Sequence, residues 1–216
     1  MDILSYILGK KSSSGGGTDL SDYFTSTIDS NGFSAMIKKI PDNITVVGTD
    51  LTNAFRNFKG TEIPLFDTSS VTNMVSMFSG CINLTTIPLL NTSNVTKTTS
   101  MFNGCISLIS VPLLDLSNVL TNNANNMFSG CTNLTTIPIL NTSGLTFMTN
   151  MFSDCPSLTD ISLDNLLQMC INSGITLSTR KQLSSVGLTS DNYPVSRIEA
   201  LPHYQDFIDA GWTIGY

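Results

Sequence analysis

The stretch NLTTIPLLNTSNVTKTTSMFNGC spans residues 83–105 and returns along the chain with small changes. Its Met-Phe pair occurs at Met77, Met101, Met127 and Met151, so the spacings are 24, 26 and 24 residues. Other apolar positions recur in phase with this pair; they are Cys81, Cys105, Cys131 and Cys155, then Leu84, Leu108, Leu134 and Leu158, then Ile87, Val111, Ile137 and Ile161. A fixed period of this length indicates stacked structural repeats.

A fifth, partial copy lies upstream. Ala54 and Phe55 take the Met-Phe place, and IPLFDTSSV (63–71) matches IPLLNTSNV (87–95). This copy lacks the cysteine and the Gly-Cys turn. We expect a terminal coil there, because the outer face of an end repeat meets no neighbouring repeat.

Each unit divides into three pieces. LTTIPLL (84–90) alternates β-branched and apolar residues and predicts a strand, and NTSN (91–94) predicts a turn. Residues 95–105 predict a short helical or 3₁₀ segment, or an irregular one, that ends at a left-handed residue; this residue is Gly80, Gly104, Gly130 or Asp154. The predicted fold class is an α/β repeat solenoid with a parallel β-sheet on one side. The two extra residues of the longer unit fall in 120–126, outside the strand.

The repeats resemble a known family. NLTTIPLLNTSNVT (83–96), followed by the Met-Phe and Gly-Cys element, is similar to the BspA-type leucine-rich repeat of bacterial surface proteins and of phages and prophages of gut bacteria. The segments 18–46 and 201–216 resemble the lead-in and the closing segment of such proteins. The start, MDILSYILGKK, is similar to leaders on virion-associated proteins of gut phages. The resemblance implies a leucine-rich-repeat solenoid, and it implies no single function.

Four parts follow from these patterns. We expect an N-terminal helix and Ser/Gly linker over 1–17, an N-terminal cap over 18–53, about five coils over 54–163, and a helical C-terminal cap over 164–216. Within that cap, 164–174 and 178–188 predict helices. A last element is expected to open at Pro202 and close at Gly211, with Trp212 wedged against the final coil.

The N-terminal helix has its apolar residues at helical spacing, namely Ile3, Leu4, Ile7 and Leu8. So short a helix is marginal alone in water. One interpretation is an assembly peptide that self-associates or attaches residues 1–11 to a virion. The other is a frayed tail or an engineered linker.

Composition excludes several classes of protein. The net charge is −6 and no long Lys/Arg cluster occurs, which argues against nucleic-acid binding. No apolar run is long enough to cross a membrane. No Sec-type signal can be recognised at the start, so an exported protein would need another route.

The sequence predicts no enzyme, metal site or cofactor. Four cysteines spaced one per coil form a line, whereas a zinc site needs ligands that converge, so we expect buried free thiols. Cys170 is expected to pack in the cap. His203 is the only histidine and is expected at the surface or in a capping position.

One row of residues suggests binding. If Ile87 and Leu89 point inward, Thr86 and Pro88 face outward with Leu90 beside them. Over the coils this gives a stripe on the sheet face for a protein or glycan ligand; it comprises Pro64, Phe66, Thr86, Pro88, Leu90, Ser110, Pro112, Leu114, Thr136, Pro138 and Leu140. The opposing interpretation is that the leucines turn inward and the prolines merely fit the bend.

The sequence therefore favours a non-enzymatic recognition or structural module, carried by a phage or prophage and associated with the virion. A bacterial surface or secreted adhesin of the BspA type is the alternative. A cytoplasmic scaffold is a third possibility.

Overall fold

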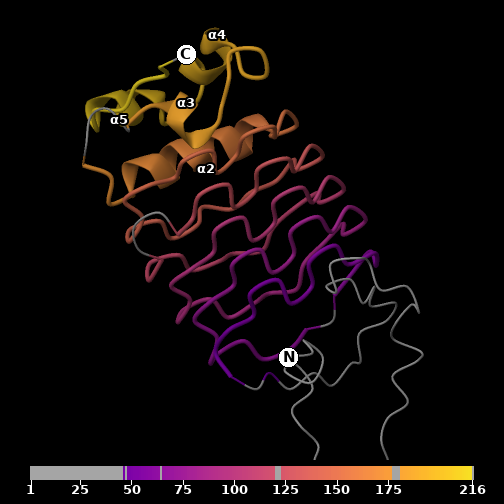
Figure 1. Ribbon diagram of the computed structural model, residues 1–216. Helices are drawn as coiled ribbons and strands as arrows, with labels where there is room; N and C mark the ends of the chain where they lie inside the picture. The colour runs from indigo at the N-terminus through magenta and orange to yellow at the C-terminus, as the bar shows by residue number, and fades with distance from the viewer. Residues whose placement is uncertain (1–45, 47, 64, 120–122, 177–180, 216) are drawn as a thin grey trace, which may run out of the picture.

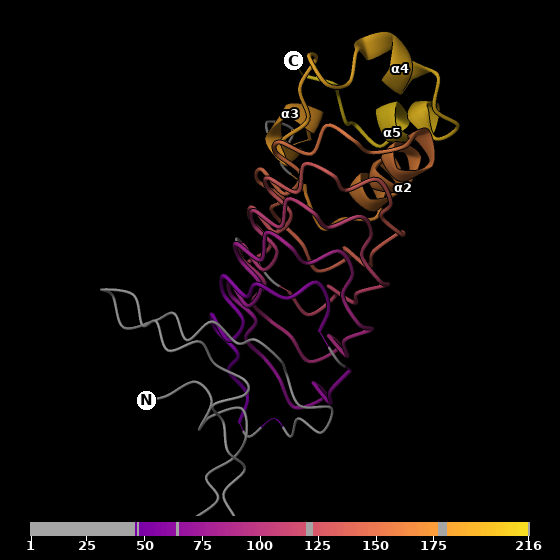
Figure 2. The same ribbon diagram turned by 90° about the vertical axis from the view of Figure 1, so that its right-hand side faces the viewer.

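The computed structural model describes residues 46, 48–63, 65–119, 123–176 and 181–215. In these ranges the chain winds into stacked coils that end beneath helices α2 to α5 (Figure 1). A view turned by 90° shows the coils stacked along one direction, with the helices at the C-terminal end (Figure 2). The chain is a repeat solenoid, as its periodicity predicts. The predicted helix with Ile3, Leu4, Ile7 and Leu8, residues 12–45 and Pro64 lie outside the described ranges.

The Met-Phe side of each coil carries the hydrogen bonds that join the coils. The backbone amide of Phe78 donates to the carbonyl of Met101 (2.9 Å), and that of Phe102 donates to the carbonyl of Met127 (2.8 Å). Every second amide in this segment makes such a bond, so the coils are held by a ladder along the solenoid axis. The ladder resumes at Asn123, which accepts from the amide of Thr98. Residues 120–122 of the longer unit lie outside the described ranges.

The segment on this side is a run of turns, so the helical option predicted for 95–105 is wrong. Left-handed residues interrupt it at Ser100 (φ +56°) and Gly104 (φ +72°). An α-helix would use each amide within its own segment. The left-handed residues leave alternate amides free to reach the next coil. The left-handed conformation predicted for Gly80, Gly104, Gly130 and Asp154 is confirmed.

The predicted parallel sheet is not confirmed. Within the described ranges, the opposite side of the solenoid has isolated parallel bridges, such as Ser110 with Thr136 and Asp115 with Asn141. A proline stands in each expected strand and has no N–H to donate to a ladder. Threonine hydroxyls supply part of the missing linkage, as where Thr135 Oγ1 donates to the carbonyl of Ile109 at 3.2 Å.

The core is built from the in-phase rows, except that Ile161 is exposed on helix α2 (Asp160–Ile171). Five phenylalanine rings, one per coil, stack in a column with centroids 5.3 to 5.5 Å apart and interplanar angles of 3 to 12°; they are Phe55, Phe78, Phe102, Phe128 and Phe152. Beside them the four cysteine thiols of the coils each donate to the carbonyl of a phenylalanine in the preceding coil, as Cys105 Sγ does to Phe78 (3.1 Å). All five cysteines are free and buried, which confirms their predicted place in the core.

The C-terminal cap begins four residues before its predicted start. Helix α2 runs over Asp160–Ile171, and the side chain of Thr159 caps it by accepting from the amide of Ser162. The polar cap residue and the acidic first turn favour a start at this point.

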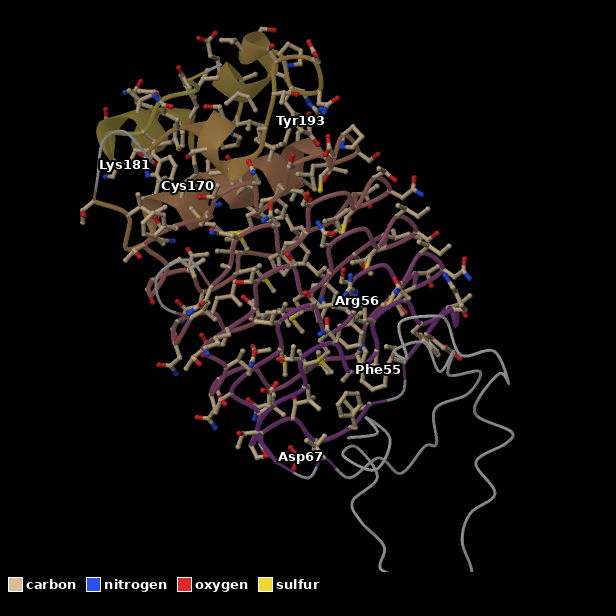
Figure 3. All side chains as sticks on the ribbon, viewed as in Figure 1. Phe55, Arg56, Asp67, Cys170, Lys181 and Tyr193 are labelled. Atoms are coloured by element: carbon tan, nitrogen blue, oxygen red, sulfur yellow. The ribbon has the colours of Figure 1, made fainter. Side chains whose placement is uncertain are left out.

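Three short helices complete the cap. They are α3 (Leu183–Val186), α4 (Val195–Glu199) and α5 (Tyr204–Asp209). The sequence patterns missed α4. Trp212 is buried and packs against Phe207 of α5, with ring centroids 5.6 Å apart. Figure 3 shows Cys170 and Tyr193 at this end and Phe55 near the other.

Candidate functional site: a groove across three coils

The predicted stripe is wrong in its apolar members. Leu90, Leu114, Leu140 and Phe66 are buried in the core. Their neighbours one residue earlier face the solvent, with Leu89 64% and Leu113 62% exposed, and Leu65 and Ile139 lie in the same row. The chain does not keep strict alternation from Ile87 to Leu90, because the proline between them interrupts regular strand geometry.

The other members of the stripe are partly accessible. Thr86 and Thr136 are exposed, and Ser110 and the prolines Pro88, Pro112 and Pro138 are half-buried. The opposing interpretation, that the row containing Leu90 turns inward, is confirmed for the described coils.

A groove lies along the corrected apolar row. It has a volume of about 960 Å³ and crosses three consecutive coils up to the end of α2. Leu89, Leu113 and Ile139 expose their side chains along it, and Asn172 closes it at the helical end. The complete lining is Leu89, Leu90, Asn91, Thr92, Ser93, Leu113, Leu114, Asp115, Ile139, Leu140, Asn141, Thr142, Ser143 and Asn172.

The second wall of the groove is a row of turns, one per coil. Asn91 Oδ1 accepts from the amide (3.1 Å) and the hydroxyl (2.7 Å) of Ser93, and Asn141 Oδ1 accepts likewise from Ser143. These bonds fix the side chains, because an Asn or Asp that accepts from the residue two positions on closes a local turn. They use the amide oxygen and leave the Nδ2 group as a donor at the surface.

The same turn occurs at Asp67, outside the groove. Hydrogen bonds from the hydroxyl and the backbone amide of Ser69 lower the pKa of the Asp67 carboxyl, because they favour its charged form. The sequence indicated these turns correctly and missed their place along the groove. The available signal was their fixed distance, two residues after the exposed leucine or isoleucine of each coil.

One known family matches the region of the coils. A model of the family described as "Mycoplasma protein of unknown function, DUF285" matches residues 49–166, which is more than half of the chain. The chain belongs to the DUF285 family. Its description assigns no activity. No curated protein matches the DUF285 chain.

Two solved structures similar to the DUF285 chain are leucine-rich-repeat proteins. One, from Eubacterium ventriosum, is 22% identical, with a TM-score of 0.41, and the match covers 60% of this chain and 35% of that one. The other, from T. pallidum, is 14% identical, with a TM-score of 0.26, and the match covers 69% of this chain and 94% of that one. The chain thus spans about a third of the Eubacterium protein. The BspA type of repeat is not confirmed by these comparisons.

The thiols of the DUF285 coils are poor nucleophiles. Burial raises the pKa of Cys155 to about 12, and it raises the pKa of Cys131 and Cys170 as well. The neighbouring Cys81 thiol is the largest cause of the raised pKa of Cys105, ahead of its burial. Because the thiolate is the reactive form, these side chains act as core residues at neutral pH.

His203 joins two helices of the cap. Its Nδ1 lies 2.7 Å from Asp164 Oδ2, and its backbone amide donates to Asp164 Oδ1 (2.9 Å). Asp164 belongs to α2 and is nearly buried, so the pair fixes the start of α5 against α2. This agrees with the capping position expected from the sequence.

The described ranges contain no group of three metal-ligating side chains and no helix able to cross a membrane.

Proposed function

We propose that this repeat protein is a non-enzymatic recognition module whose groove binds a protein partner. The observation that carries the proposal is the row of Leu89, Leu113 and Ile139, three aliphatic side chains left exposed in consecutive coils of a concave surface. Exposed apolar patches with a polar rim mark interaction sites. Covering a leucine of this exposure contributes about 1–2 kcal/mol, so three of them supply a useful affinity.

A protein partner fits this surface better than a glycan. The groove exposes three aliphatic side chains, and aliphatic surface gains most from contact with other aliphatic surface. The amides of Asn91 and Asn141 stand beside them as donors for backbone carbonyls. A glycan ligand stays as the alternative.

We also propose that the protein has no enzymatic activity. The support for this is that Cys131 and Cys155 are buried with raised pKa values, and that His203 is engaged by Asp164. None of these residues lines the groove.

We also propose a place for the protein, on the strength of its sequence resemblance. It is virion-associated, carried by a phage or prophage and attached through residues 1–11, with a bacterial surface or secreted adhesin as the alternative. Quantitative mass spectrometry of purified particles and of cell envelopes tests this. A variant without residues 1–17 should be absent from the purified particles. Equal amounts of this variant and of the full chain in the particles would refute attachment by this segment.

Site-specific cross-linking tests the binding surface. A photo-reactive amino acid at position 113 should cross-link a discrete protein partner in the producing culture. The matched control places it at Ile106, which is also exposed but lies outside the groove. The same adducts from both positions, or none from position 113, would refute the proposal.

A further inference from the structure

The groove has an uneven charge distribution. Among the described residues that line it, Asp115 is the only charged one. It stands at the turn position that asparagine occupies in the coils on both sides, as Asn91 and Asn141. The centre of the groove therefore carries a negative charge between two neutral amides.

The turn holds the Asp115 carboxylate in place without neutralising it. Its Oδ1 accepts from the amide of Ser117 (3.0 Å), and its backbone amide donates to Thr92 Oγ1 (2.8 Å). In the described part of the chain, the salt bridges involve Asp160 and Asp164 and not this residue. A fixed carboxylate with one oxygen available suits a cationic partner group.

Helix α2 adds to the negative electrostatic potential of the groove. Its C-cap Asn172 lines the end of the groove, and its last turn contains no basic residue. The C-terminus of a helix carries a partial negative charge. The carboxylate of Asp115 and the end of α2 thus favour positive charge in the same groove.

The spacing of the coils sets the length of chain that fits. The stacked phenylalanine rings of adjacent coils have centroids 5.3 to 5.5 Å apart, which sets the approximate rise per coil. Two such steps, from Leu89 to Ile139, match about three residues of extended chain at roughly 3.3 Å each.

We infer that the groove binds an extended segment of the partner protein in which a lysine or arginine, flanked by aliphatic residues, pairs with Asp115. This rests on the proposed function and specifies the partner. The aliphatic residues cover Leu89, Leu113 and Ile139, and the cation lies in the row of turns.

Selection from a peptide library tests the inference. Random heptapeptides are displayed and selected on the immobilised full chain, on Asp115→Asn, and on Leu113→Glu. Asparagine is a sound replacement, because Asn91 and Asn141 make the same turn. Peptides selected on the natural chain should share a lysine or arginine beside aliphatic residues, and Asp115→Asn should lower their affinity about tenfold.

The outcomes separate the two proposals. The inference is supported if the natural chain prefers peptides with a lysine or arginine and Asp115→Asn does not. Aliphatic peptides without a cation, or cationic peptides that Asp115→Asn binds equally well, overturn the inference and leave the binding groove intact. If the natural chain enriches peptides no more than Leu113→Glu does, the groove is not a peptide site and the inference falls with it.

Discussion

Replacing one ring of the phenylalanine column should cost more in the middle than at the end. Phe102 is fully buried and stacks on two rings, with centroid distances of 5.3 Å to Phe78 and 5.5 Å to Phe128. Phe152 is equally buried but stacks on Phe128 alone. Leucine at either position keeps most of the apolar burial. The two variants therefore differ mainly in the number of ring pairs lost.

The expected magnitudes follow from this count. An aromatic pair contributes about 0.5–1.5 kcal/mol beyond its burial, and the smaller leucine side chain costs about 1 kcal/mol at either site. Phe102→Leu should lower the free energy of unfolding by about 2–4 kcal/mol, and Phe152→Leu by about 1.5–2.5 kcal/mol.

Urea denaturation provides the assay. Far-UV circular dichroism follows the coils, and the fluorescence of Trp212, the single tryptophan, follows the C-terminal cap. Equal m-values would show that the same surface unfolds in both variants. A cost for Phe152→Leu as large as that for Phe102→Leu would refute the contribution of the stacked column.

Three further results are expected. Gly144→Ala should destabilise by about 3 kcal/mol or more, because the new Cβ would lie 2.0 Å from the carbonyl oxygen of Ser117. Gly104→Ala meets no such overlap and should cost about 1–2 kcal/mol for its left-handed φ. Equal melting temperatures of the two variants would contradict this. Tyr193→Phe should cost about 1–3 kcal/mol, because it removes the hydroxyl that bonds a backbone amide and a carbonyl of the last coil; an unchanged urea midpoint would count against it. The neutral thiol of Cys155 stabilises fully below its unfolded pKa of about 9, and its contribution should fall by about 1.4 kcal/mol per pH unit between pH 9 and about 12 as the unfolded thiol ionises. The natural chain should therefore lose about this much more stability per pH unit than Cys155→Ala, and equal slopes for the two chains in calorimetry would oppose the assignment.

Sequence patterns predicted the core more completely than the surface. The Met-Phe, Cys and Leu rows are buried as expected, because each coil repeats the same environment and a single phase assigns all of them. The left-handed glycines were also predictable from residue type. The ladder on the Met-Phe side was not, since it depends on φ values at residues such as Ser76 and Ser100, whose type does not require them.

The candidate site was misplaced by one residue. Leu89 and Leu90 are both leucine, and hydrophobicity does not say which one faces the core. A regular strand would bury Leu89 with Ile87, but Pro88 breaks the alternation and Leu90 is buried instead. The C-terminal cap shows the same limit, because the start of α2 depends on capping by Thr159 rather than on periodicity.

The affinity of two matched variants for one peptide tests the groove most directly. A peptide selected on the natural chain is titrated against Leu113→Glu, inside the groove, and against Ile106→Glu, exposed on the same repeat outside it. Leu113→Glu should weaken binding about tenfold, because it removes about 1–2 kcal/mol of apolar contact and places an ionised side chain against the aliphatic residues of the peptide. Ile106→Glu should leave the affinity within about twofold. Equal losses, or a larger loss from Ile106→Glu, would contradict the assignment of the groove as the binding site.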